Sequence, residues 1–201
     1  MISAVQADSF LEHPHCGMVL STRKAVMRDI PAILRLINGY AAQGVMLPRT
    51  EFEMSEAIRD FTVVMNGEEM LGCGALHFYS PTVGEIRSLA VSERAKAHGV
   101  GRRIVEALID EANTYELDAV FAFTYVVGFF NKMGFNTVER GVLPLKAWKD
   151  CLRCPKFHEC DEIAVLRILR PGHWAATPMN SQGEPWGPGT ESYIQLPTPR
   201  L

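Results

Sequence analysis

The chain has 201 residues, of which 47% are hydrophobic and 21% are charged, so it is long and apolar enough for one soluble globular domain. Its formal net charge of −3 comes from interspersed acidic and basic residues, which argues against a nucleic-acid partner. No stretch has the pattern of a secretory signal or a membrane span, so we expect a cytoplasmic protein without a membrane partner.

The start of the chain predicts an arm, a strand and a helix. Residues 1–17 have no periodicity and are expected to form a flexible arm, followed by a strand over 19–26. Asp29 can cap a helix and Pro31 fits its first turn, and apolar residues then recur at helical spacing until Gly44.

A second helix and a hairpin are expected next. Thr50 and Glu53 form a capping-box pattern, which predicts a short helix over 51–60. The pair Asn66-Gly67 is typical of a tight turn, because both residues tolerate positive φ angles. The strands that this turn would join are 61–65 and 69–79.

A strand, a glycine loop and a helix follow as one unit. Residues 84–91 predict a strand, and residues 99–115 have one apolar face and predict an amphipathic helix. Between them lies Lys96-Ala-His-Gly-Val-Gly101, whose small residues let a backbone approach a ligand closely. Since the helix start also offers unpaired N–H groups and a positive dipole end, the loop can bind a pyrophosphate. The glycines of such a pattern can also serve only the turn, because the motif alone is weak.

The remainder of the chain alternates short elements with irregular segments. An insert is expected over 143–162, and a tail rich in proline and glycine over 171–201. The predicted elements are strands at 119–126, 136–139 and 163–169, and a short helix at 128–133.

The glycine unit resembles a motif of the GNAT superfamily of N-acetyltransferases. Leu89-Ala-Val91 followed by Lys96-x-x-Gly-x-Gly101 is similar to that family's Arg/Gln-x-x-Gly-x-Gly/Ala signature, although Lys96 replaces the usual first residue. The resemblance covers residues 18–170 and implies an α/β fold with a central mixed, mostly antiparallel twisted sheet flanked by helices. It also implies acetyl-CoA as co-substrate. The expected cofactor-binding residues are Leu89, Ala90, Val91, Lys96, Ala97, His98, Gly99, Val100, Gly101 and Arg102.

A narrower resemblance points to the acceptor. Leu47-Pro-Arg49, Gly72-Cys-Gly-Ala-Leu-His77, Glu85-Ile-Arg-Ser-Leu-Ala-Val91 and Cys-Pro-Lys-Phe-x-x-Cys-Asp-Glu are similar to the short, single-domain N-acetylglutamate synthases. This resemblance implies acetylation of the α-amine of L-glutamate or glutamine, as the first step of arginine biosynthesis.

Acetyl transfer to an amine needs a base, an oxyanion donor and an acid for the leaving thiolate. Glu85 begins the strand expected to bind the pantetheine arm, so we predict it as the base; the alternative is a solvated carboxylate. The resemblance assigns the oxyanion to the backbone N–H groups of 89–91. Phe130 stands where many family members place a tyrosine, so Tyr125 is the candidate acid, or else a core residue.

Two arginines are candidates for holding an acidic acceptor, because a guanidinium matches a carboxylate with two hydrogen bonds. Arg49 lies in the loop between the first two helices, and Arg87 shares a strand face with Glu85. Each can instead make an ordinary ion pair.

Three cysteines cluster within the insert, at Cys151, Cys154 and Cys160. Their spacing allows a zinc site, but a second well-separated ligand pair is missing, so we expect reduced thiols and no metal. Several functional questions stay open: acetylation of another small amine or a peptide N-terminus, a non-catalytic sensor of acetyl-CoA or an amino acid, and a homodimer.

Overall fold

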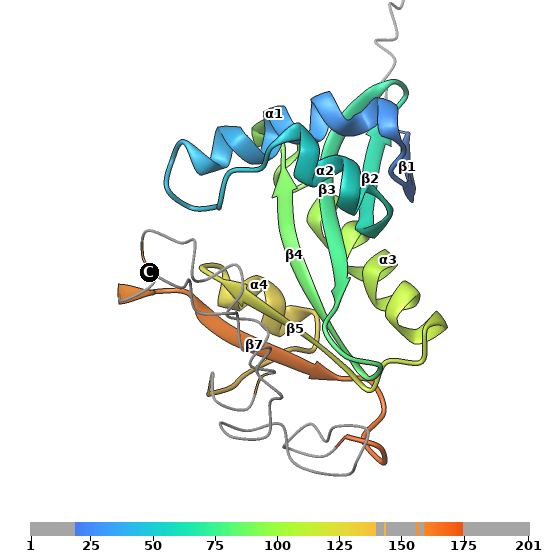
Figure 1. The fold of residues 1–201 in the computed structure, drawn as a ribbon, viewed down its shortest axis with the longest axis vertical. Coiled ribbons are helices and arrows are strands. Elements are labelled where there is room, and N and C mark those ends of the chain that lie inside the picture. The colour runs from blue at the N-terminus through green and yellow to red at the C-terminus, as the bar shows by residue number, and fades with distance from the viewer. Residues whose placement is uncertain (1–18, 140–142, 144–155, 157–158, 175–201) are drawn as a thin grey trace, which may run out of the picture.

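A computed structural model gives the positions of residues 19–139, 143, 156 and 159–174, which form a sheet with helices packed on it (Figure 1). The strands are β1 (Leu20–Lys24), β2 (Phe61–Asn66), β3 (Glu69–Phe78), β4 (Val83–Val91), β5 (Ala119–Thr124), β6 (Asn136–Thr137) and β7 (Ile163–Ile168). The helices are α1 (Ile30–Ala41), α2 (Glu51–Ala57), α3 (Val100–Thr114) and α4 (Val127–Lys132), with 3₁₀ turns η1 (Met27–Asp29), η2 (Ile58–Asp60) and η3 (Glu93–Ala95).

The seven strands form one sheet in the order β1-β2-β3-β4-β5-β7-β6. All neighbouring pairs are antiparallel except β4 and β5, which are parallel. The structure therefore confirms the expected fold class, a mixed and mostly antiparallel sheet flanked by helices.

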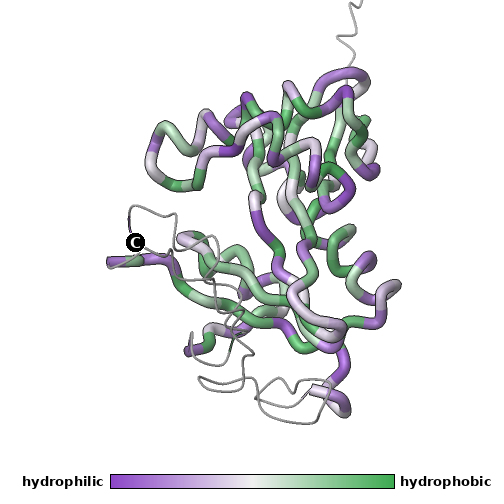
Figure 2. Tube along the Cα trace, viewed as in Figure 1, coloured by the Kyte–Doolittle hydropathy of each residue, from purple (hydrophilic) through white to green (hydrophobic). Residues whose placement is uncertain are grey.

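Helices cover both faces of the first half of the sheet. Successive side chains of a strand point to opposite faces, and in β2 the side chains of Val63 and Met65 pack with α1 and α2, whereas Val64 packs with α3. Figure 2 shows mostly hydrophobic residues along β2 and β3, a hydrophilic stretch within β4, and residues of both kinds along the helices. β2 and the middle of β3 are buried on both faces because helices cover both sides of them.

The start of α1 differs in one contact from the prediction. Pro31 lies in the first turn as expected, but the Asp29 side chain makes no capping bond to the helix. Its two oxygens accept hydrogen bonds from the Arg23 guanidinium at 2.7 and 2.9 Å, and one of them also accepts the Val26 N–H at 2.8 Å. Asp29 thus ties β1 to α1, because a bidentate arginine is a stronger partner than a helix N–H.

The predicted capping box of α2 is present. Thr50 Oγ1 accepts the Glu53 N–H at 3.3 Å, and the Glu53 carboxylate accepts the Thr50 N–H at 2.9 Å. The helix ends at Ala57, three residues before the predicted end, and the chain continues as η2.

The β2–β3 hairpin is also present, with its turn shifted by one residue. Asn66 pairs with Glu69, so Asn66 is the last residue of β2 and the turn consists of Gly67 and Glu68. Gly67 adopts the positive φ of +60°.

The remaining predicted strands and helices in the described residues are found within a few positions of their expected ends. Among the described residues, no helix is long and apolar enough to cross a membrane. The predicted arm over 1–17, most of the insert over 143–162 and the tail beyond residue 174 lie outside the described residues.

Candidate functional site

The sheet opens between its two parallel strands. β5 pairs with β4 only through Ala119–Phe121, which lie against Val83–Glu85. From Ile86 onward β4 has no strand partner on that side among the described residues, and Figure 1 shows the two strands diverging. We call this opening the β4–β5 split. A strand edge with unpaired N–H and C=O groups can bind an extended ligand.

A bulge in β4 lies beside the split. Ser88 and Leu89 of β4 both lie opposite the single residue Gly74 of β3. Ser88 has a φ of +52°, which is uncommon for a residue other than glycine. Because a bulge re-aims the backbone groups around it, it determines the direction in which the N–H groups of 89–91 point.

The predicted glycine loop connects the end of β4 to α3. Ala97 and Gly99 have φ angles of +66° and +75°, so the chain turns on both sides of His98. Residues 96–99 are exposed, and α3 begins immediately afterwards at Val100. The first N–H groups of α3 have no carbonyl partner inside the helix and lie at its positive dipole end. The loop therefore has the chemistry of an anion site.

The two glycines of the loop have different roles. A Cβ at Gly99 would meet nothing within 4 Å, so Gly99 serves the left-handed turn. A Cβ at Gly101 would lie 3.5 Å from the Phe129 ring and 3.6 Å from the Val91 side chain, so Gly101 lines a narrow space between α3, α4 and β4. This space is a cradle that a side chain would begin to fill.

Two further glycines bring α3 close to the sheet. A Cβ at Gly72 or Gly74 would lie 2.9 or 2.7 Å from Ile104 of α3. Since real Cβ atoms do not approach this closely, both positions require glycine for the helix to dock at this distance.

The basic side chains around the loop have acidic partners on the surface. The pairs are Arg94 with Glu69, Lys96 with Glu93 at 2.6 Å, and Arg102 with Glu106 at 2.7 Å. Exposed pairs of this kind contribute little to stability, so a phosphate can compete for the cations.

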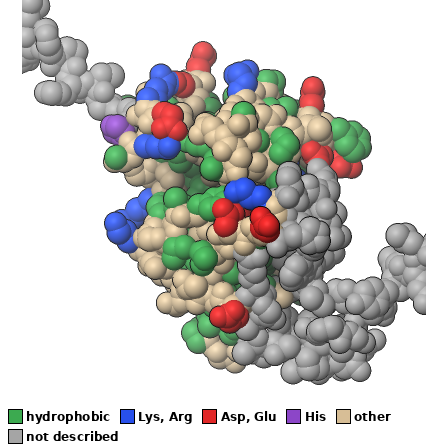
Figure 3. Space-filling model, turned by 90° about the vertical axis from the view of Figure 1, so that its left-hand side faces the viewer, with side chains coloured by type: hydrophobic (Ala, Val, Ile, Leu, Met, Phe, Trp, Pro, Cys, Tyr) green, Lys and Arg blue, Asp and Glu red, His purple; other side chains and the backbone are tan. Residues whose placement is uncertain are grey.

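Glu85 and Arg87 lie together where the split begins. Their side chains are only 12% and 16% exposed, and Arg87 Nη1 is 4.0 Å from Glu85 Oε2. Glu85 is also the last residue of β4 that pairs with β5, opposite Phe121. The structure therefore brings the predicted base and one predicted acceptor arginine to the same place. Figure 3, which views this side of the molecule, shows acidic and basic side chains gathered near its middle among apolar ones.

His77 lies on the strand next to Glu85. The two residues are direct partners in the β3–β4 register, so their side chains share one face of the sheet. His77 Nδ1 is 2.9 Å from the Asp60 carboxylate, and its ring meets Tyr79 edge-on at 5.1 Å. His77 thus has a fixed orientation beside the predicted base.

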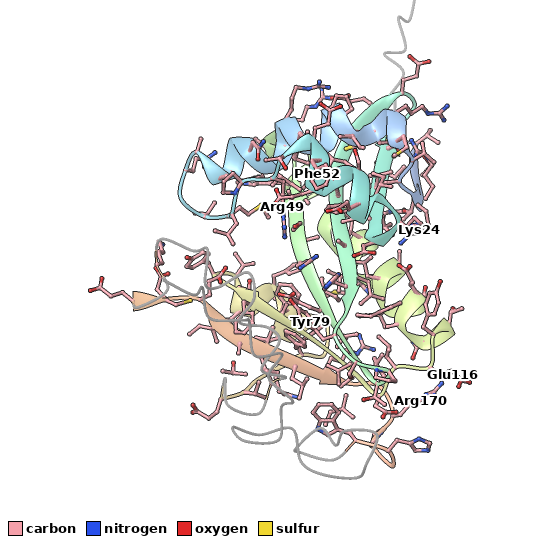
Figure 4. All side chains as sticks on the ribbon, in the orientation of Figure 1. Lys24, Arg49, Phe52, Tyr79, Glu116 and Arg170 are labelled. Carbon is pink, nitrogen blue, oxygen red and sulfur yellow. The ribbon has the colours of Figure 1, made fainter. Side chains whose placement is uncertain are left out.

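Arg49 is held through its backbone. The Asn38 side chain of α1 accepts the Arg49 N–H at 2.9 Å and donates to the Arg49 carbonyl at 3.0 Å. Figure 4 shows the Arg49 side chain directed from its loop along β4, toward the split. The role of Asn38 was missed in the sequence, because an asparagine inside a helical pattern carries no signal for a contact with a later loop.

Tyr125 and Phe130 have different surroundings. The Tyr125 hydroxyl donates to Asp161 at 2.8 Å, and Lys156 Nζ lies 3.1 Å from the same hydroxyl. Partial burial raises the pKa of Tyr125 above its ordinary value. Phe130 is 3% exposed and stacks edge-on against Phe129 and Phe135, so it contributes packing and no proton.

Two cysteines, Cys73 and Cys160, lie in the described part of the chain. Cys73 is fully buried, and burial raises the pKa of its thiol to about 12, so the thiol stays protonated. Cys160 is partly buried, and no group of His, Cys, Asp and Glu among the described residues could hold a metal ion. Cys151 and Cys154 lie outside the described residues.

The sequence matches one family model and several known proteins. The acetyltransferase (GNAT) family model matches residues 33–135, which is just over half of the chain. An uncharacterized N-acetyltransferase of Chlorobaculum tepidum is 41% identical over 147 residues, which cover 73% of this chain and 95% of that protein. An amino-acid acetyltransferase of Mycobacterium tuberculosis is 35% identical over 120 residues, which cover 58% of this chain and 68% of that protein.

Solved structures of other proteins are also similar to this chain. N-acetylglutamate synthase from Neisseria gonorrhoeae, complexed with coenzyme A and N-acetyl-glutamate, has a TM-score of 0.69 and 30% identity. The match covers 75% of this chain but only 35% of the synthase, so this chain corresponds to about a third of that protein. A Mycobacterium tuberculosis protein in complex with CoA and NLQ has a TM-score of 0.64 and 28% identity, and the match covers 74% of this chain and 99% of that one.

Proposed function

Because this chain belongs to the GNAT acetyltransferase family and is an N-acetyltransferase, we propose that it transfers the acetyl group of acetyl-CoA to the α-amine of L-glutamate or glutamine. The observation that carries this proposal is the mostly buried Glu85–Arg87 pair at the β4–β5 split, within a fold shared with a solved N-acetylglutamate synthase. In a cell this reaction would be the first step of arginine biosynthesis.

The donor binds along the split and the glycine loop. The diphosphate of acetyl-CoA lies on residues 96–102, where the first N–H groups of α3 are unpaired within the helix. The pantetheine arm then runs along the free edge of β4, past the bulge at Ser88. Two observations support this fit: the cradle at Gly101, and the Ser92 hydroxyl, which is buried without a partner among the described residues.

Glu85 acts as the base and the backbone of residues 89–91 supplies the oxyanion donors. Glu85 takes a proton from the acceptor ammonium, directly or through one water, so that the amine nitrogen can attack the thioester carbonyl carbon. N–H groups stabilise the negative charge on the carbonyl oxygen of the tetrahedral intermediate. The carbon–sulfur bond then breaks, and the leaving thiolate takes a proton from the Tyr125 hydroxyl. The nitrogen loses its second proton to water as the amide forms, and water returns a proton to Tyr125.

Arg49 and Arg87 hold the two carboxylates of glutamate. Arg87 stands beside the base, so it binds the carboxylate nearer the reacting amine, and Arg49 reaches from the opposite loop. Such a pair selects an anionic acceptor over a polyamine, whose positive charges both arginines would repel.

A thiol-release assay tests the proposal. The protein is mixed with acetyl-CoA and one acceptor at a time: L-glutamate, L-glutamine, L-lysine, spermidine or a neutral peptide with a free N-terminus. We expect the highest kcat/KM with glutamate or glutamine. Higher turnover with the peptide or spermidine would contradict the acidic acceptor, and CoA binding without turnover on any amine would indicate a sensor.

A further inference from the structure

Tyr40, in the last full turn of α1, contacts the end of β4. Its hydroxyl donates to the Val91 carbonyl at 2.5 Å, and the Glu93 carboxylate lies 3.2 Å from the same hydroxyl. Partial burial raises the pKa of Tyr40, so its phenol keeps its proton at neutral pH and stays a donor.

The bond fixes a peptide group that borders the split. The Ser92 N–H donates to the Leu71 carbonyl of β3 at 2.8 Å, so the Val91 carbonyl in the same trans peptide points away from β3. In an extended strand the N–H and C=O of one residue point to the same side. The Val91 N–H therefore also faces the split. The next peptide group is held at both ends, by the Tyr40 hydroxyl at the Val91 carbonyl and by the Leu71 carbonyl at the Ser92 N–H.

The same tyrosine reaches the glycine loop. Lys96, the first residue of the loop, pairs with Glu93 at 2.6 Å, and its Nζ lies 5.4 Å from the centre of the Tyr40 ring. One side chain of α1 thus contacts both the strand that would bind the thioester end of the donor and the loop that would bind its diphosphate.

We propose that Tyr40 is a positioning residue that holds the glycine loop and the end of β4 in the relative position at which one acetyl-CoA molecule binds to both. This inference rests on the proposed function, since it needs a donor that spans the two segments. It assigns a role in donor recognition to a helix that otherwise borders the acceptor side. Nothing in the sequence pattern separates Tyr40 from the apolar residues of the α1 core face.

The test compares two donors. Acetyl-CoA uses the loop and the strand, whereas S-acetylpantetheine lacks the diphosphate and uses the strand alone. Tyr40→Phe keeps the ring and removes only the hydroxyl. We expect it to lower kcat/KM about tenfold with acetyl-CoA, as the loss of one hydrogen bond between partly buried groups allows, and to lower it at most about twofold with S-acetylpantetheine.

Tyr115→Phe is the matched control, because Tyr115 is 58% exposed at the far end of α3 and stacks on Phe78. Tyr115→Phe should leave kcat/KM unchanged with both donors. If Tyr40→Phe lowers kcat/KM equally with both donors, the hydroxyl positions only the strand. If it leaves kcat/KM unchanged with both, the hydroxyl positions neither segment. Either outcome overturns the inference. Absence of turnover with the wild-type protein would instead contradict the proposed function.

Discussion

Glu85 and Arg87 are charged side chains with little exposure to solvent. Charged groups are rarely so buried, and those that are buried are usually paired. Their 4.0 Å separation is longer than that of a close ion pair, which is typically under 3 Å for a charge-assisted hydrogen bond. In the proposed reaction, the Glu85 carboxylate meets the ammonium of the acceptor, and Arg87 binds the carboxylate of that acceptor.

Removal of the Glu85 charge should slow acetyl transfer without weakening cofactor binding. We expect Glu85→Gln to lower kcat by roughly 10² or more, because the amide cannot accept the proton, with CoA affinity nearly unchanged. Steady-state kinetics and calorimetry measure the two effects. Glu116→Gln, at an exposed residue, is the control. A variant with near wild-type kcat across neutral pH would show that Glu85 is not the base.

The two arginines should be distinguishable by a comparison of glutamate with glutamine. We expect Arg49→Met or Arg87→Met to cost about 2–4 kcal/mol in kcat/KM for glutamate, because each leaves a carboxylate unpaired. The variant that lacks the arginine for the side-chain carboxylate should no longer distinguish glutamate from glutamine. The other variant should lose kcat/KM equally with both amino acids. Wild-type kinetics in both variants would exclude an acidic acceptor bound by these residues.

At the scale of elements, periodicity and turn chemistry predicted most of the described fold. The capping box at Thr50, the proline in the first turn of α1 and the apolar face of α3 depend on neighbours in the sequence, so a local pattern can reveal them. The strand–loop–helix unit around Gly99 was predictable for the same reason, and it places the candidate donor site.

Contacts between distant segments could not be predicted in this way. The bulge at Ser88 is defined by its register against β3, and the close approach at Gly74 is defined by Ile104 of α3. The clamp from Asn38 to Arg49 joins a helix to a loop eleven residues later. Each depends on tertiary packing, which leaves no fixed spacing in a single sequence.

The start of α3 should tolerate one added methyl group but not a branched side chain. We expect Gly101→Ala to weaken CoA binding by at most about threefold, since its Cβ would sit in ordinary contact with Phe129 at 3.5 Å. Gly101→Val adds two methyl groups to the same narrow space and should weaken binding at least about tenfold. Calorimetry with CoA measures both affinities. Equal, wild-type affinities would argue against a cofactor at this helix start.

At the scale of the whole molecule, the sheet consists of two parts joined by few strand contacts. The register between β4 and β5 contains three residue pairs, whereas β5 and β7 share six. One apolar cluster crosses the junction on the α3 side, from Val64 of β2 to Val165 of β7. A second lies on the opposite face of the first part, and a third lies around β5 and β7. The shared cluster therefore joins the two parts of the sheet on the α3 side, although β4 and β5 pair only as far as Glu85.

The stability of the fold should depend on pH through Asp29. The Arg23 hydrogen bonds lower the pKa of Asp29 below its ordinary value. A depressed folded-state pKa adds stability that is present above the unfolded-state pKa, about 4, and is lost as pH falls through the folded-state pKa. We expect Asp29→Asn to cost about 1–2 kcal/mol at pH 7, since Arg23 is partly exposed to solvent.

Urea unfolding at several pH values measures this dependence. The difference between the wild-type protein and Asp29→Asn should shrink as the pH falls below about 4. Asp110→Asn, at an exposed position of α3, is the control and should change stability little at any pH. A difference that is the same at pH 3 and pH 7 would contradict the assigned ion pair.

A crystal structure with CoA and N-acetylglutamate bound would test the central claim most directly, because it places donor and acceptor in one measurement. We predict that the diphosphate lies within hydrogen-bond distance, about 3 Å, of backbone N–H groups between Lys96 and Arg102. The two carboxylates of the product should contact Arg49 and Arg87, with the acetylated nitrogen beside Glu85. A product bound away from the β4–β5 split, with neither carboxylate on these arginines, would contradict the account.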